Sequence, residues 1–176
     1  MRMLDLFAGL GGASQAMLAR GWEVVTVDND ARFGCTHTAD LATWSHAGPQ
    51  VDLVWASPPC TEFSRESMPW CRTGNPPGLD LVKAAIRIIR EVKPAWWALE
   101  NVRGSVKWIK PLLGEPKMRC GPFVLWGHFP PFTLRFRGKK KESYSSAQRS
   151  ERAKVPMDLS EAIARACESN LLAGVV

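Results

Sequence analysis

One apolar run that ends at two prolines and a cysteine constrains the fold of this chain more than any other feature. Val51 to Trp55 has the length and composition of a buried strand. Pro58 and Pro59 end that strand, because proline lacks a backbone N–H and has a fixed φ. Cys60 then follows the strand's carboxyl end, where open α/β sheets place their ligands. Cys60 is therefore either a nucleophile or a buried small side chain, since free cysteines are among the most buried residues.

Three further apolar runs are also followed by glycines or polar residues. Residues 2–7, 23–27 and 95–99 read as strands, and they lead into a glycine-rich turn, Asp28 and Glu100 respectively. Residues 79–92 form an amphipathic helical pattern of the length that connects two parallel strands. We therefore predict an α/β fold with a mostly parallel sheet flanked by helices. The carboxyl ends of parallel strands share one edge, so these residues should surround one crevice.

The glycine-rich turn suggests a nucleotide-like ligand. Gly9 and Gly11 permit a tight turn and let a ligand approach the backbone, and Gly12 lets the following helix pack close to the strand. The Gly-x-Gly-Gly spacing does not favour a dinucleotide. Asp28 follows about 20 residues later, where such folds hold ribose hydroxyls, so an adenosine-like cofactor is indicated. The alternatives are a plain turn for the glycines and helix capping or turn formation for Asp28 and Asp40.

Size and composition indicate one soluble globular domain over residues 1–176. The 176 residues are 45% hydrophobic and 23% charged, and no apolar run reaches the roughly 18 residues of a membrane span. The five cysteines are widely spread, without a Cys-x-x-Cys pair, which favours a reducing, cytoplasmic setting. We expect no metal site, because the cysteines and histidines fit no usual ligand spacing.

The net charge of +6 is concentrated in one segment. Arg135 to Lys154 contains eight basic and two acidic residues, while the rest of the chain is balanced. A basic segment on a neutral body favours contact with a phosphate backbone, and a solvated loop is the alternative. We further expect a late strand within residues 121–127 and a final helix over residues 156–167. Residues 70–78 form either a lid or a connecting loop.

Three motifs resemble, in order, signature motifs of the cytosine-5 DNA methyltransferases. They are Asp5–Gly12 (DLFAGLGG), Pro59-Cys60 with Phe63-Ser64, and Glu100–Val102 (ENV). In that family the first motif binds S-adenosylmethionine, the second carries the nucleophile and the third carries a glutamate. The resemblance covers residues 2 to about 104. It implies the Rossmann-like fold of S-adenosylmethionine-dependent methyltransferases.

The resemblance also implies roles for individual residues. Cys60 would attack carbon 6 of cytosine, and Glu100 would stabilise the charge that develops at ring nitrogen 3 and the exocyclic amine. Glu100 should be partly protonated in a dry pocket, and a nearby helix start should lower the pKa of the Cys60 thiol. Asp28 would hold the ribose and Asp40 the adenine amino group. The residues implied at the cofactor are Phe7, Gly9, Leu10, Gly11, Gly12, Asp28, Asn29, Asp40 and Pro58.

The chain departs from the family in three places. The Gln-x-Arg-x-Arg element that follows the glutamate motif is absent, and Arg103 as a catalytic residue and Arg119 at the nucleic acid are the expected substitutes. The family's Gly-Asn-Ser-Val helix has no match, and residues 154–160 are expected in its place. Residues 133–155 form a short basic segment where full members insert a target-recognition domain. The residues implied at the nucleic acid are Ser64, Arg119, Lys139, Lys140 and Lys141.

We therefore expect a minimal methyltransferase of bacterial or bacteriophage type that acts on carbon 5 of cytosine in double-stranded DNA. A base inside a duplex must be flipped out to reach Cys60. With few base contacts, sequence recognition would be relaxed, or a protein partner would supply it. The alternatives are an RNA substrate, or a catalytically silent DNA-binding relative that works through a partner.

Overall fold

The computed structural model describes residues 1–65, 75–134 and 154–173, with side chains to residue 170. Strands and helices alternate along most of the chain. The strands are β1 Arg2–Leu6, β2 Glu23–Asp28, β3 His37–Thr38, β4 Leu53–Ala56, β5 Trp96–Val102, β6 Met118–Cys120 and β7 Phe123–His128. The helices are α1 Gln15–Ala19, α2 Thr61–Arg65, α3 Asp80–Val92, α4 Val106–Leu113 and α6 Met157–Ala173.

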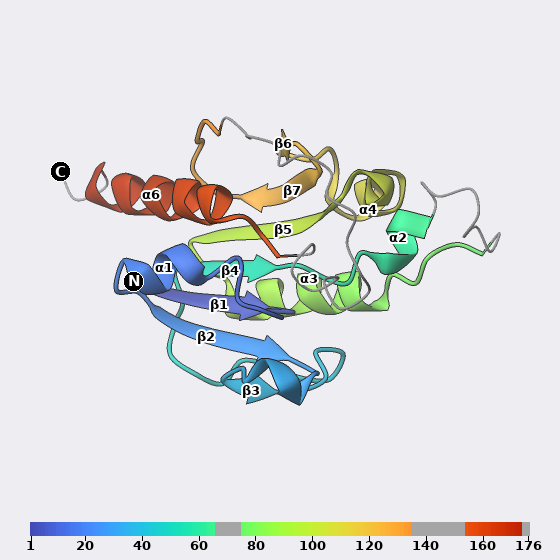
Figure 1. Ribbon diagram of the computed structural model, residues 1–176, viewed down its shortest axis with the longest axis horizontal. Helices are drawn as coiled ribbons and strands as arrows, with labels where there is room; N and C mark the ends of the chain where they lie inside the picture. The colour runs from blue at the N-terminus through green and yellow to red at the C-terminus, as the bar shows by residue number, and fades with distance from the viewer. Residues whose placement is uncertain (66–74, 135–153, 174–176) are drawn as a thin grey trace.

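The strands form one sheet in the order β3-β2-β1-β4-β5-β7-β6. The first five strands of that order are parallel, and β7 runs antiparallel to β5 and β6. In Figure 1 the arrows of β1 and β2 accordingly point to the same side, and β7 points back. The chain order reverses between β1 and β4, and open α/β sheets bind ligands at such a switch point.

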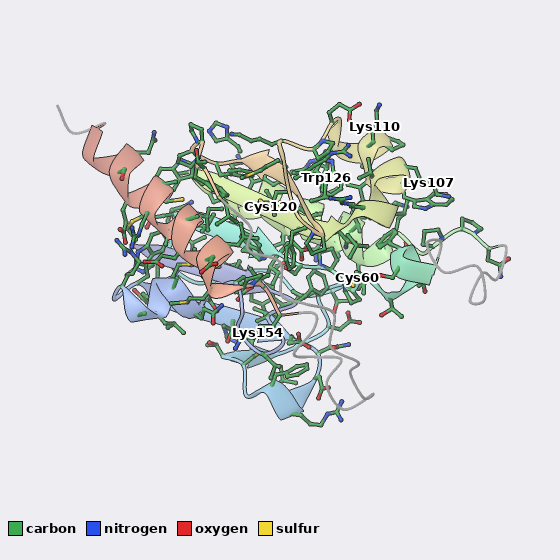
Figure 2. All side chains as sticks on the ribbon, turned by 45° about the horizontal axis from the view of Figure 1, so that its top comes forward. Cys60, Lys107, Lys110, Cys120, Trp126 and Lys154 are labelled. Carbon is green, nitrogen blue, oxygen red and sulfur yellow. The ribbon has the colours of Figure 1, made fainter. Side chains whose placement is uncertain are left out.

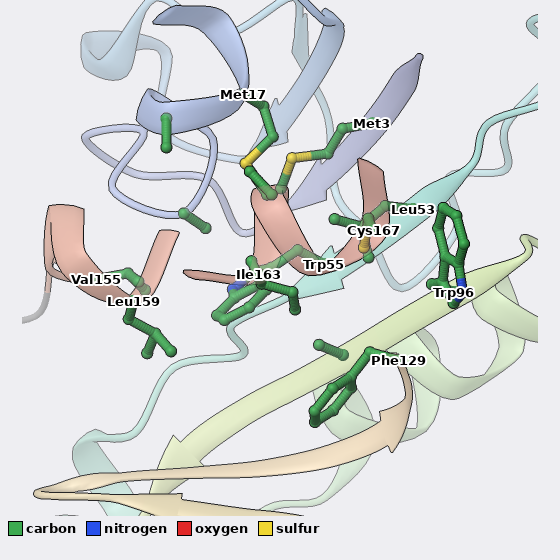
Figure 3. Packing of buried hydrophobic residues seen from close by; sticks show 14 of the residues in the cluster. Met3, Met17, Leu53, Trp55, Trp96, Phe129, Val155, Leu159, Ile163 and Cys167 are labelled. Carbon is green, nitrogen blue, oxygen red and sulfur yellow. The ribbon is translucent and has the colours of Figure 1, made fainter. Parts of the chain in front are cut away.

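Two apolar clusters hold helices against opposite faces of the sheet. One cluster joins α1 and α6 to side chains such as Met3 and Trp55 (Figure 3), and the other joins α3 and α4 to side chains such as Leu4 and Leu99. Alternate residues of a strand point to opposite faces, which is why Met3 and Leu4 enter different clusters. The described residues therefore form three layers, with the switch point between the two helical layers.

The predicted fold class is confirmed, and most predicted elements are present. All four predicted strands form, and β4 and β5 are parallel as expected. Asp28 is the last residue of β2, and Glu100 lies inside β5, which continues to Val102. The late strand is present as β7, and the final helix begins at Met157. The prediction did not include α4, whose interior contains Pro111, because a proline normally indicates the end of a helix. Among the described helices, none is both long and apolar enough to cross a membrane.

Candidate functional site

The glycine turn connects β1 to α1 at the switch point, and its backbone is left-handed at three positions. Gly9 and Gly11 have φ of 50° and 68°, as expected for residues without a Cβ, and Phe7 has φ of 59°. A non-glycine residue in this region is strained, and such residues cluster at functional sites. A Cβ added at Gly9 would meet no atom of the described residues within 4 Å, so among these residues the space beside that backbone is open.

Gly12 has a different task from the one predicted. A Cβ there would lie 2.6 Å from the backbone nitrogen of Val155, and not against β1. Gly12 therefore lets the chain that enters α6 lie against the turn. Gln15 reinforces this contact, because its side-chain amide donates to the carbonyl oxygens of Gly12 (2.7 Å) and Val155 (3.0 Å).

Residues 154–160 were expected to replace the family's missing motif beside the cofactor. The first of these residues, which lead into α6, lie against the glycine turn. Lys154 and Val155 line the same cavity as the glycine turn, and Lys154 is labelled in Figure 2. Ser160 links α6 to α1, since its hydroxyl donates to the carbonyl of Ala13 (2.5 Å) and accepts the N–H of Ala16 (3.1 Å). The C-terminal helix thus closes one wall of the site, although its sequence does not match the family motif.

Asp28 holds the glycine turn against the end of β2. Its carboxylate accepts the backbone N–H of Gly9 at 2.9 Å and that of Asp30 at 3.0 Å. This turn-forming role was the alternative that the sequence left open. The ribose contact remains a proposal.

The loop that carries Cys60 is tied to both neighbouring strands. The N–H of Ser57 donates to the carbonyl of Leu6 in β1 (3.2 Å), and the side-chain amide of Asn101 at the end of β5 donates to the carbonyl of Pro58 (2.9 Å). The prolines then turn the chain, and α2 starts at Thr61, directly after Cys60. The cysteine is thereby presented at the carboxyl edge of the sheet.

These elements enclose one cavity of about 190 Å³. It brings together most of the residues predicted at the cofactor with Cys60 and Glu100, two of the three predicted catalytic residues. Its lining consists of Asp5, Phe7, Ala8, Gly9, Leu10, Gly12, Ala13, Phe33, Ser57, Pro58, Pro59, Cys60, Glu100, Lys154 and Val155. A glycine turn, a thiol and a carboxyl from three different strand ends thus share one space, which is the convergence expected of a parallel sheet.

The electrostatics of Cys60 contradict the prediction of a lowered pKa. Burial raises the pKa of the thiol, the negative charge of Glu100 raises it further, and a hydrogen bond with Ser64 partly opposes both. The prediction was wrong because desolvation of the buried thiol is the largest effect on its pKa, and it outweighs the hydrogen bond with Ser64. Cys60 is therefore a neutral thiol in the free protein at neutral pH.

Glu100 behaves as predicted for a carboxyl in a dry pocket. The residue is 8% exposed, and burial raises its pKa to about 7, while a hydrogen bond from Ser57 acts in the opposite direction. A carboxyl with this pKa exists in both protonation states near neutral pH, as a group that gives and regains a proton requires.

Asp5 is a buried acid that the sequence reasoning did not assign to the site. Its pKa is raised to about 7, first by burial and then by the charge of Asp28, with hydrogen bonds from Ser14 opposing both. Its Oδ2 atom is buried without a hydrogen-bond partner in the part of the chain that the structure describes, and the residue lines the cavity. A charged residue inside an apolar strand was the available signal, because such a position needs a specific reason.

Several predicted site residues lie outside the cavity lining. Asp40 is exposed and accepts the N–H of Ala42, which is the turn-forming alternative. Arg103, directly after β5, is exposed and donates its Nε–H to the carbonyl of Gly121 (3.0 Å), so its side chain binds the β6–β7 turn. Also outside the lining are Gly11, Asn29, Ser64, Arg119 and Asp28. Lys139, Lys140 and Lys141 lie outside the described residues.

Comparison with known proteins points to one family. The family model of the C-5 cytosine-specific DNA methylases matches residues 1–110. A protein of Frog virus 3 named "Probable DNA (cytosine-5)-methyltransferase" is 32% identical over 117 residues, which cover 57% of this chain and 53% of the viral protein. The Herpetosiphon aurantiacus protein named "Type II methyltransferase M.HgiGI" is 29% identical over 117 residues, 58% of this chain and 90% of that protein.

The structural comparison supports the fold. The structure of the Entamoeba histolytica methyltransferase EhMeth superposes with a TM-score of 0.51 at 16% identity, over 81% of this chain and 57% of that one. The chain thus spans about half the length of the viral relative and of this structural neighbour. The match over residues 1–110 contains the glycine turn, Cys60 and Glu100, and this chain belongs to the C-5 cytosine-specific DNA methylase family.

Proposed function

We propose that this chain transfers a methyl group from S-adenosylmethionine to carbon 5 of cytosine in DNA, through a covalent bond between Cys60 and carbon 6. The observation that carries the proposal is the cavity itself. It places the only thiol and the only glutamate among its lining residues beside a glycine turn with an open backbone face. The family match provides independent support for the same chemistry.

The residues at the turn fit an adenosyl sulfonium cofactor. The open face at Gly9 leaves room for a ligand at the backbone, and the apolar surfaces of Phe7 and Leu10 border the same space. Asp5 and Lys154 add polar groups to the walls. When bound, S-adenosylmethionine supplies an electrophilic methyl group on positively charged sulfur. Few polar groups in a mostly apolar cavity is the usual composition of a small-molecule site.

Cys60 and Glu100 act on different atoms of the base. The Cys60 thiol loses its proton to solvent, and the thiolate adds to carbon 6 while Glu100 gives its proton to ring nitrogen 3, so that no isolated charge develops on the ring. Carbon 5 then has enamine character and takes the methyl group, and the bonding electrons stay with the sulfur. Loss of the carbon 5 proton to solvent expels Cys60 as thiolate and re-forms the aromatic ring, and nitrogen 3 returns its proton to Glu100.

The raised pKa values of the two groups fit these roles. The negative charge of Glu100 opposes ionisation of Cys60, so protonation of Glu100 makes loss of the Cys60 proton easier. Burial still raises the pKa of the thiol in that state, so the thiolate forms during the reaction. A protonated Glu100 beside a Cys60 thiolate is the arrangement that the addition step requires.

The test is transfer of labelled methyl from S-adenosylmethionine to nucleic acid. We expect incorporation into cytosine-containing duplex DNA, with incorporation abolished in Cys60→Ala and lowered by at least about 100-fold in Glu100→Gln. The cytosine-free duplex is the matched control. Incorporation into RNA alone would replace the DNA assignment, and binding of the cofactor without transfer to either nucleic acid would contradict the proposed activity.

A further inference from the structure

Glu100 is buried beside Ser57, which lies in the loop before Cys60. β4 and β5 pair in parallel with Ala56 opposite Leu99, so the next residues, Ser57 and Glu100, are neighbours, and both line the cavity. In the hydrogen bond between their side chains Ser57 is the donor, because an ionised carboxylate can only accept. The backbone of Ser57 is also fixed, because its N–H donates to Leu6 in the neighbouring strand. The backbone position from which the Ser57 hydroxyl extends is therefore fixed.

Trp55 decides where the proton of that hydroxyl points. The indole Nε1–H of Trp55 donates to Ser57 Oγ at 2.7 Å. An indole nitrogen is a donor only, so Ser57 must be the acceptor in this pair. A hydroxyl that accepts from one partner keeps its single proton for another, and Glu100 is the acceptor within reach. The direction of the chain is thus from Trp55 through Ser57 to Glu100.

Trp55, the first residue in this series of hydrogen bonds, is held in place by the hydrophobic core. Trp55 is fully buried in the cluster between the sheet and α6, and Figure 3 shows its ring beside Ile163. A side chain packed in this way cannot change rotamer without opening the core. The indole N–H therefore keeps its direction, and a carboxyl at the site is oriented by a group anchored in the core rather than by a mobile surface side chain.

We propose that Ser57 is a positioning residue for Glu100, and that Trp55 fixes the Ser57 hydroxyl so that its proton points at the Glu100 carboxyl. The inference rests on the proposed function, because it matters for catalysis only if Glu100 acts on the base. One carboxyl oxygen is then held by Ser57, and the other is left for the ring nitrogen and amine of cytosine. The same bond offsets part of the desolvation of Glu100 and keeps its pKa near neutrality.

The test is a titration of Glu100 that requires neither cofactor nor nucleic acid. Protein with 13C-labelled glutamate carboxyl groups is titrated by NMR, and the Glu100 signal is assigned by its loss in Glu100→Gln. The pKa in the unsubstituted protein should be about 7. Ser57→Ala should raise it by about one to two units, since a hydrogen bond to a charged group contributes about 1.5–3 kcal/mol and one unit corresponds to about 1.36 kcal/mol.

Three variants make the test specific. Ser57→Thr keeps the hydroxyl and should titrate like the unsubstituted protein. Ser105→Ala removes another buried hydroxyl just beyond β5, one that donates to the carbonyl of Val102, and should leave the Glu100 pKa unchanged. Trp55→Phe keeps an aromatic ring in the core but removes the N–H, and should raise the Glu100 pKa by less than Ser57→Ala does.

The results separate this inference from the proposed function. An unchanged Glu100 pKa in Ser57→Ala, or an equal rise in Ser105→Ala, overturns the positioning role whatever the activity. No change in Trp55→Phe overturns the part assigned to Trp55. If Ser57→Ala shifts the pKa as expected but the unsubstituted protein transfers no methyl group, the positioning holds and the proposed function fails.

Discussion

The side-chain amide of Asn101 donates to the carbonyl oxygen of Pro58 at 2.9 Å, and both groups are buried. This bond ties the residue after Glu100 on β5 to the loop that presents Cys60. This hydrogen bond and the pairing of β4 with β5 therefore together fix the distance between Cys60 and Glu100. Asn101 belongs to the ENV motif of the sequence, but only the structure shows that its side chain binds the carbonyl of Pro58.

Asn101→Ala should weaken both stability and methyl transfer. It leaves the buried carbonyl of Pro58 without a partner, which costs about 1–3 kcal/mol of unfolding free energy. Misplacement of Cys60 relative to Glu100 should lower the turnover rate by about 100-fold. Urea unfolding and the methyl-transfer assay measure the two effects. The control is Asn170→Ala, an exposed asparagine on α6; equal behaviour of the two variants would refute the coupling.

Asp5 should make the protein less stable as the pH rises. Its folded pKa of about 7 lies above its unfolded value of 3.8, so the folded state binds more protons between these values. The contribution of Asp5 to the free energy of unfolding is then complete below about pH 4. It falls as the pH rises to about 7, by as much as about 4 kcal/mol. Asp5→Asn removes the titration, so its advantage over the unsubstituted protein should grow from pH 5 to pH 8.

Urea unfolding at several pH values checks this prediction. Glu100 contributes a fall of the same sign, so the informative quantity is the difference between Asp5→Asn and the unsubstituted protein. Asp158→Asn removes a charge from an exposed position on α6 and serves as the control. A difference for Asp5→Asn that stays constant across this pH range would mean that Asp5 is ionised in the folded protein.

The glycines of the turn should respond differently to alanine. Gly12→Ala places a Cβ within 3 Å of the Val155 backbone and should lower the unfolding free energy by about 1–3 kcal/mol. Gly9→Ala meets no atom, so its stability cost comes only from the positive φ, about 1 kcal/mol. Its Cβ enters the space proposed for the cofactor and should weaken binding of S-adenosylmethionine, measured by calorimetry. Equal cofactor affinity in Gly9→Ala would place the ligand elsewhere.

Charge reversal at Lys139, Lys140 and Lys141 should weaken DNA binding and flatten its salt dependence. Each phosphate contact that is lost lowers the slope of log K against log salt by about 0.9. The matched control reverses the exposed Lys83 and Arg90 on α3. Fluorescence anisotropy with duplex DNA at several salt concentrations measures both. Unchanged affinity and slope in the triple variant would return the basic segment to the solvated-loop interpretation.

Apolar runs and the polar residues after them were enough to predict the parallel half of the sheet and the meeting of the glycine turn with Cys60 and Glu100. Parallel strand ends share an edge whatever the packing details, so this inference needs only strand positions. The interactions that tune the site could not be predicted in this way. The bonds from Trp55 to Ser57 and from Asn101 to Pro58 depend on rotamers and loop geometry, which periodicity does not encode.

The pKa of Cys60 shows the same limit. A helix start after the cysteine was predicted, and α2 is present, but only the structure shows the burial of the thiol and its exposure to the charge of Glu100. Gly12 is similar, because the need for glycine was recognised while the partner, Val155, lies far along the chain. In both cases the residue type could be interpreted from the sequence, but the surroundings that explain it could not be predicted.

Trapping with 5-fluorocytosine DNA tests the central claim, that Cys60 attacks the base. Fluorine at carbon 5 cannot leave as the proton does, so the covalent adduct persists after methyl transfer. With S-adenosylmethionine present, mass spectrometry of the digested complex should find the modified base on the peptide that contains Cys60, and Cys60→Ala should give no adduct. An adduct on another cysteine such as Cys71, or methyl transfer without any adduct, would contradict the account.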